Sequence, residues 1–262
     1  MKFLGVVRTE VTKLRRSKVT WISFAIYLFM VGMAAFFMWM MMNPGVAKSI
    51  GLLGQKAQFA VAGLSTDWPG FLVLIVEMGG LGGLIVFSII TTYVFGREYV
   101  EGTAKNMLAL PVPRSRFVFA KILVLAVWFA ALTAWLILEA WVAGTILGIQ
   151  GFTAVLFLSA AKRILVLALM SFCSASLVAW VAVETRGYFA PLGFAIFTMV
   201  LASAFGHTGW GPWVPWSIIG LYSGTAGPDT SLGWGSGVVI GATFLIGTAL
   251  AVRHEVLADN GQ

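Results

Sequence analysis

The stretch FLVLIVEMGGLGGLIVFSIITTYVF, residues 71–95, decides the fold. Its single charged side chain is Glu77, and the residues around it are apolar on every side of a helix. A helix needs about 20 apolar residues to cross the hydrocarbon core of a bilayer, which is roughly 30 Å thick. We therefore predict that residues 71–95 form a membrane-spanning helix.

The composition extends this prediction to the whole chain. Of the 262 residues, 60% are hydrophobic and only 10% are charged, whereas a soluble domain carries about 25% charged residues. Apolar runs predict five more spans, at residues 21–42, 117–147, 164–183, 188–205 and 236–252, with a short amphipathic stretch at 152–163 before the fourth. The predicted fold class is all-α, a polytopic membrane protein with six transmembrane helices.

Two segments outside the spans have a character of their own. In residues 1–20, apolar side chains such as Phe3 and Val7 alternate with basic ones at helical spacing, which predicts an N-terminal amphipathic interfacial helix. A plain positive flank of the first span is the alternative. Residues 206–235 are rich in Trp and Pro, which favour the membrane interface and interrupt helices. They predict a broken re-entrant or interfacial hairpin before the last span. We expect residues 21–262 to form one six-span transmembrane domain.

The distribution of Lys and Arg predicts the orientation. If the N-terminus is cytoplasmic, 13 of the 17 basic side chains fall in inside segments and four fall outside. Inside loops of membrane proteins carry the excess of positive charge. We expect a multi-pass membrane protein with both termini cytoplasmic. The net charge of +7 follows from this topology, and we expect no nucleic-acid partner.

The residue inventory argues against a metal or cofactor site on this chain. Cys173 is the single cysteine, and His207 and His254 are far apart in the sequence. No Gly-x-x-x-x-Gly-Lys-Ser/Thr stretch is present, so the chain lacks the P-loop that binds ATP phosphates. We expect a protein without enzymatic activity.

The segment between the second and third spans, residues 96–116, carries the most specific pattern. It reads GREYVEGTAKNMLALPVPRSR. Thr103 can cap a short helix over residues 104–110, which Pro111 would end. An exposed short helix between two span ends suits docking onto another protein. A plain polar connection is the alternative, but it does not account for the ordered carboxylates, Gly-Thr pair, proline and arginines.

This segment resembles the permease subunits of type-2 ABC exporters, and within them the bacitracin and lantibiotic immunity permeases. The residues that fit the pattern of that family are Glu98, Gly102, Thr103, Leu108, Pro111, Arg114, Phe117 and Lys121. The amphipathic first helix, the six spans and the broken segment before the last span are similar to that family too.

The resemblance implies a location in the bacterial cytoplasmic membrane, a function and partners. By this resemblance the chain would form half of an export path and would pair with a second permease copy as a homodimer. Two copies of a separate ABC ATPase would power export, and those subunits would bind the ATP and Mg. Residues 96–116 would be the ATPase-coupling element. Its candidate residues are Glu98, Glu101, Gly102, Thr103, Lys105, Pro111, Arg114 and Arg116. The cargo would be an amphipathic compound such as a peptide antibiotic, drug or lipid, and the outcome antibiotic resistance.

Glu77 and Glu139 lie inside predicted spans, where a carboxylate is costly unless it has a partner or a cavity. We expect both in the outer half of the membrane, close to each other. They are substrate-path candidates, and a hydrogen bond between helices is the alternative. Two other functions stay open at this point: a secondary transporter that uses these carboxylates as ion sites, and a non-transporting scaffold.

Two Gly-x-x-x-Gly patterns occur in the spans, at residues 79–83 and 237–241. Such spacing lets two helices approach closely. We predict packing within the chain as the use of both, and a seam between two copies of the chain is the alternative.

Overall fold

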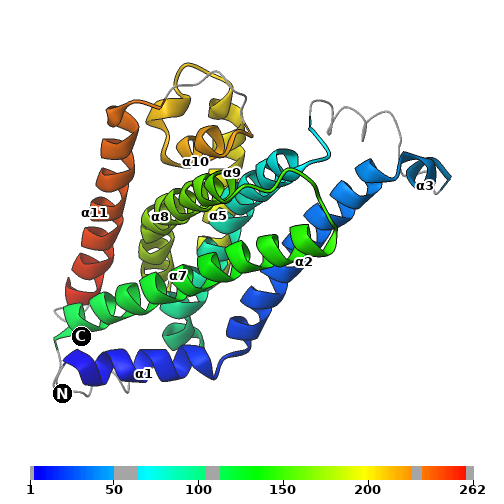
Figure 1. The fold of residues 1–262 in the computed structure, drawn as a ribbon. Coiled ribbons are helices and arrows are strands. Elements are labelled where there is room, and N and C mark those ends of the chain that lie inside the picture. Colours follow the sequence, from blue (N-terminus) through cyan, green and yellow to red (C-terminus); the bar gives the residue numbers. More distant parts are fainter. Residues whose placement is uncertain (1–2, 50–63, 104–112, 226–231, 258–262) are drawn as a thin grey trace.

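The computed structural model describes residues 3–49, 64–103, 113–225 and 232–257, and every regular element within them is helical (Figure 1). In chain order these are α1 (Phe3–Arg15), α2 (Lys18–Met42), α3 (Pro44–Ser49), α5 (Trp68–Val100), α7 (Arg114–Ile146), α8 (Ala154–Thr185), α9 (Phe189–Gly206), the 3₁₀ turn η1 (Gly211–Trp213), α10 (Pro215–Ser223) and α11 (Trp234–Leu257). Six of them, α2, α5, α7, α8, α9 and α11, have the length and hydropathy to cross a membrane. The all-α, six-span prediction is confirmed.

Both ends of the described chain lie on one side of the bundle, the lower side in Figure 1. We call this the lower end, and it also holds the start of α7 and the finish of α5. The opposite, upper end holds the start of α5, the start of α8 and the short helix α10. The helix α1 lies across the lower end and packs mainly against α7.

The central helix is α5, which packs most extensively against α8 and also contacts α2, α7, α9 and α10. It begins at Asp67, whose carboxylate accepts a hydrogen bond from the Gly70 amide at 3.0 Å. The Ser65 hydroxyl and this amide lower the pKa of Asp67, because both hydrogen bonds favour the charged carboxylate. The cap and the proline at position 69 account for a sharp helix start.

Stacked aromatic rings join the three longest helices in the core. Phe87 of α5 stacks on Phe129 of α7 with ring centroids 3.7 Å apart, and Phe129 meets Phe172 of α8 edge-on at 5.9 Å. Such pairs contribute about 0.5–1.5 kcal/mol each beyond the area they bury. In lipid this close packing, rather than release from water, holds helices together.

The separate stretch predicted at residues 152–163 is wrong, because α8 runs unbroken from Ala154. Thr153 caps it by accepting a hydrogen bond from the Leu156 amide at 3.3 Å. The basic pair at 162–163 does not end the helix because Arg163 finds partners: it donates to the Tyr222 carbonyl at 3.0 Å and lies over the Tyr222 ring. A helix of 32 residues is about 48 Å long and projects beyond the hydrocarbon.

The chain between α9 and α11 is broken, as its prolines predict. α9 ends at Gly206, η1 follows, and Pro215 starts α10, which ends at Gly224 with φ of +96°. α10 buries Ile218 and Ile219 and packs against α5, α8 and α9. A short helix enclosed by three spans lies within the bundle rather than on its outer surface.

Candidate functional site

The residues predicted to couple this chain to an ATPase gather at the lower end. α5 continues to Val100 and α7 begins at Arg114, so the first five residues of the segment 96–116 belong to α5. Lys105, Pro111 and the short helix predicted at 104–110 lie outside the described residues. The described residues of the segment lie at the end of α5 and the start of α7, and ion pairs connect these two helices to each other and to α1.

Glu98 is the centre of these ion pairs. Its carboxylate accepts a hydrogen bond from Lys121 Nζ of α7 at 2.5 Å and another from Lys13 Nζ of α1 at 2.8 Å. Lys13 Nζ also lies 2.5 Å from Glu10 Oε1 on its own helix. These four side chains, which we call the lower ion cluster, connect α1, α5 and α7.

The lower ion cluster is largely shielded from water. Glu98 is 7% exposed and Lys121 is 3% exposed, and the Lys121 ammonium also lies 5.2 Å from the centre of the Phe95 ring. Burial alone would lower the pKa of Lys13, but the charges of Glu98 and Glu10 outweigh it and raise that pKa. Two carboxylates face two ammonium groups, so each buried charge has a counter-charge.

The Gly-Thr pair after Glu98 ends α5. Gly102 has φ of +68°, a left-handed conformation that suits glycine at a helix end. The Thr103 hydroxyl donates back to the Glu98 carbonyl at 3.4 Å. Glu101 is exposed and pairs with Arg97 one turn earlier, with 2.9 Å between Arg97 Nε and Glu101 Oε2. The motif therefore places Glu98 inward and stops the helix directly beyond it.

A second set of contacts ties α11 to the same region. Tyr99 donates its hydroxyl to Glu255 Oε1 at 2.6 Å, and Arg114 Nη1 donates to the Glu255 carbonyl at 3.2 Å. His254 Nδ1 lies 2.7 Å from Glu184 Oε2 of α8. The last turn of α5 is thus linked to α11 as well as to α1 and α7.

Sequence reasoning identified Glu98, Lys121 and Arg114 but missed Lys13, Glu10 and Glu255 as their partners. Glu10 was the one available signal, because an acidic residue is unexpected on a helix otherwise rich in basic ones. It is 5% exposed and lies on the bundle side of α1. Arg116 is exposed on α7.

The two carboxylates within the spans have different surroundings. Glu139 of α7 is 7% exposed and has no ion pair among the described residues. The Trp135 indole N–H, one turn earlier on α7, is the polar group that interacts with its carboxylate, although the two do not form a hydrogen bond of good geometry. Glu77 of α5 is half-buried, and a Cβ placed on Gly224, just after α10, would lie 3.9 Å from its Oε1. No ion pair or hydrogen bond joins Glu77 to Glu139 in the described structure, and their proximity stays a prediction.

Comparison with known proteins shows the family of this chain. The sequence profile of the family described as ABC-2 family transporter protein matches residues 6–202, which include most of α1, all four residues of the lower ion cluster and most of α9. The chain is also 26% identical, over 177 residues, to the bacitracin transport permease protein BCRB of Bacillus licheniformis, an alignment that covers 66% of this chain and 83% of that protein. The resemblance seen in the sequence is confirmed, and the chain belongs to the ABC-2 transporter family as a multi-pass membrane permease.

Proposed function

We propose that this chain forms half of an export path that a separate ABC ATPase powers. The observation that carries the proposal is the family match, which spans the helices α1, α5 and α7 that the lower ion cluster joins. The absence of a P-loop from the sequence supports an ATPase on another polypeptide. A second copy of this chain would supply the other half of the path, with one ATPase under each copy.

In this proposal the lower end faces the cytoplasm and the ATPase. A force on the segment after α5 would move several helices together, because Glu98 links α5 to α1 and α7. Glu255 would carry the same displacement to α11 through Tyr99. Rigid-body movement of packed helices is a common way in which a local event becomes a global change.

The cargo is proposed from chemistry and from the named relative. BCRB is described as a bacitracin transport permease, so a peptide antibiotic of that kind is the first cargo to test. A buried carboxylate at Glu139 with no counter-charge among the described residues suits a cationic, amphipathic molecule. If Glu139 instead served as an ion site of a secondary transporter, export would follow an ion gradient and continue without ATP hydrolysis.

The decisive experiment is reconstitution of the chain with a P-loop ATPase encoded beside it, followed by co-purification and ATP-driven export in vesicles. We expect Arg116→Glu, which reverses an exposed charge at the lower end, to reduce the amount of ATPase retained. The matched control is Lys162→Glu, the same kind of reversal on exposed α8 surface at the other end. Retention of no ATPase by the unmodified chain, or equal losses from both variants, would refute the coupling proposal.

A further inference from the structure

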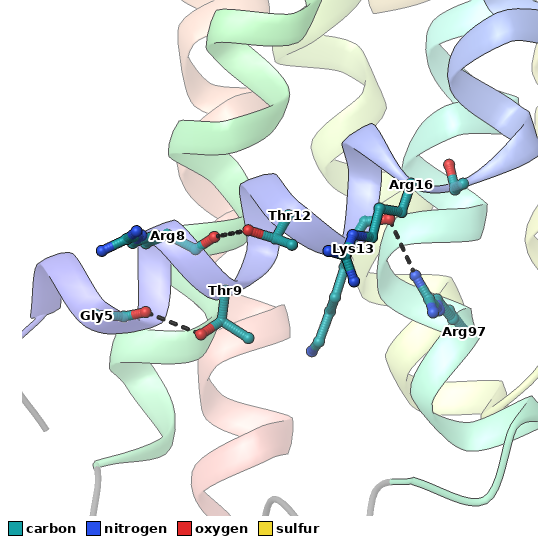
Figure 2. A pocket seen from close by; sticks show the side chains of 8 residues that line it. Gly5, Arg8, Thr9, Thr12, Lys13, Arg16 and Arg97 are labelled. Carbon is teal, nitrogen blue, oxygen red and sulfur yellow. Dashed lines mark hydrogen bonds between the residues drawn. The ribbon is translucent and has the colours of Figure 1, made fainter.

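A cationic groove of about 460 Å³ lies along α1 beside the finish of α5. Figure 2 shows its lining, with Arg8 and Lys13 on α1, Arg16 directly after the end of α1, and Arg97 reaching it from α5. Gly5 also lines the groove, and a Cβ there would meet no atom within 4 Å, so this part of the groove is open. No acidic residue lines it.

The cations of the groove are unequally neutralised. Lys13 is paired with Glu10 and Glu98, and Arg97 is paired with Glu101. Arg8 and Arg16, by contrast, have no carboxylate partner in the part of the chain that the structure describes, and both are exposed.

Hydroxyls in the groove are already engaged with the helix backbone. Thr9 donates to the Gly5 carbonyl at 3.0 Å and Thr12 to the Arg8 carbonyl at 2.8 Å. The free hydrogen-bond donors of the groove are therefore guanidinium groups. Their planar fork fits two oxygens of a phosphate or carboxylate group.

The position of the groove on α1 indicates which kind of phosphate or carboxylate group can reach it. Leu4 is 76% exposed and Val11 is 46% exposed, so this face of α1 needs a hydrocarbon environment. At 100° per residue, the row of Arg8 and Thr12 lies roughly 70° around the helix from Leu4 and Val11, and Arg16 follows directly after the last residue of α1. A helix with its apolar face in the acyl region presents such a row at the level of the headgroups.

The first turn of α2 also indicates that the groove lies at the level of the lipid headgroups. Trp21 is 75% exposed and follows α1 closely in the chain. Tryptophan prefers the boundary between water and hydrocarbon. The groove is therefore placed where lipid phosphates are concentrated.

We propose that this groove binds the phosphate headgroup of an anionic phospholipid in the leaflet where α1 lies. Arg8 and Arg16 supply the uncompensated charge, and Lys13 and Arg97 complete the cationic wall. Because Lys13 also holds Glu98, the bound headgroup would contact the same cluster that joins α1, α5 and α7. This site is independent of any ATPase and belongs to the permease alone.

The test uses native mass spectrometry of the purified full chain, released from micelles that contain phosphatidylglycerol and phosphatidylcholine. We compare Arg8→Gln/Arg16→Gln with Arg15→Gln/Lys18→Gln. The second pair removes the same two charges from exposed positions that do not line the groove. Because each basic residue near an anionic membrane surface adds about a factor of five to binding, we expect the first pair to weaken phosphatidylglycerol retention by tenfold or more. The control pair should retain one tightly bound phosphatidylglycerol.

Each other outcome overturns the proposal. Equal losses in both variants would show a diffuse surface charge rather than a site. Displacement of the lipid by inorganic phosphate or glycerol phosphate at similar concentration would show a site for soluble phosphate. Unchanged lipid retention together with loss of ATPase co-purification in the groove variant alone would assign the groove to a protein partner. Size-exclusion profiles of all variants confirm that they remain folded.

Discussion

At Glu98 one carboxylate accepts hydrogen bonds from lysines of two different helices, and the stability of the lower end depends on this. Replacing a buried acid by its amide leaves the opposing ammonium without a counter-charge. Lys121 is the more vulnerable of the two lysines, because it is 3% exposed and Glu98 is the partner that the structure gives it, whereas Lys13 keeps Glu10.

We expect Glu98→Gln to lower the free energy of unfolding by about 3–5 kcal/mol, the usual effect of removing one partner from a buried ion pair. Thermal unfolding in a fixed detergent, followed by tryptophan fluorescence, measures the change. Glu101→Gln is the control: its pair with Arg97 is exposed, and its loss changes stability by about 0–1 kcal/mol. Adding Lys121→Met to Glu98→Gln should restore most of the stability. If the double variant is no better than the single one, the stranded charge is not the cause.

Glu139 presents the opposite case, a buried carboxylate with no ion pair among the described residues. No cation in the described structure offsets its charge, and the Trp135 indole N–H, one turn earlier on α7, can serve an amide oxygen as well as a carboxylate, so Glu139→Gln should leave the thermal midpoint unchanged or raise it. If the carboxylate serves a cationic cargo, the same change lowers export of that cargo roughly tenfold, which corresponds to one lost charged hydrogen bond. Midpoint and export are measured on the same preparation. Normal export with normal stability would remove Glu139 from the path.

Among the elements, α8 and α11 make an unusually close contact at one glycine. A Cβ placed on Gly247 would lie 2.6 Å from the carbonyl carbon of Ser176 and 2.7 Å from the Leu177 amide nitrogen. Backbone atoms of a packed helix cannot move away from an added Cβ as the end of a flexible side chain can. By contrast, a Cβ on Gly241 or Gly237 would meet no atom within 4 Å, so the pattern at 237–241 does not mark the contact within this chain.

We therefore expect Gly247→Ala to destabilise the protein by about 1–3 kcal/mol, the usual effect of overpacking. The matched variant Gly241→Ala makes the same chemical change on the same helix and should be neutral or stabilising by up to about 1 kcal/mol through helix propensity. Comparison of their thermal midpoints isolates the contact. Similar midpoints for the two variants would show that α8 and α11 separate without penalty.

The elements also show which features the sequence predicted and which it did not. The six spans follow from long apolar runs, a property of neighbouring residues. The extra turn of α5 that carries Glu98 was missed because its polar residues look like a loop, although buried partners sustain them as helix. Lys13 and Glu98 are 85 positions apart in the sequence, and a pattern of neighbouring residues cannot predict a pair so far apart. Similarly, the fourth span was predicted to begin at residue 164, whereas the cap at Thr153 marks where α8 actually begins.

For the whole molecule, the excess of Lys and Arg predicts that the lower end faces the cytoplasm. The chain has one cysteine, Cys173, so a Cys173→Ser background allows single cysteines to be placed at either end. Gln150 is exposed at the upper end and Thr185 is exposed where α8 finishes below.

We expect a membrane-impermeant maleimide to label Gln150→Cys in intact cells and to label Thr185→Cys only after the membrane is opened. Labelling of both variants under denaturing conditions controls for reactivity. The reverse pattern would invert the topology and place the lower ion cluster outside the cell, where no cytoplasmic ATPase reaches it.

The lower ion cluster also bears on how the protein is made. The chain emerges from the ribosome N-terminus first, so Lys13 and Glu10 exist before Glu98 is synthesised. Lys121 follows 23 residues after Glu98. Until that lysine appears, the carboxylate at the finish of α5 lacks one of its two partners. The charge balance of the cluster is completed only when α7 begins, which favours insertion of α5 and α7 into the membrane as a single helical hairpin.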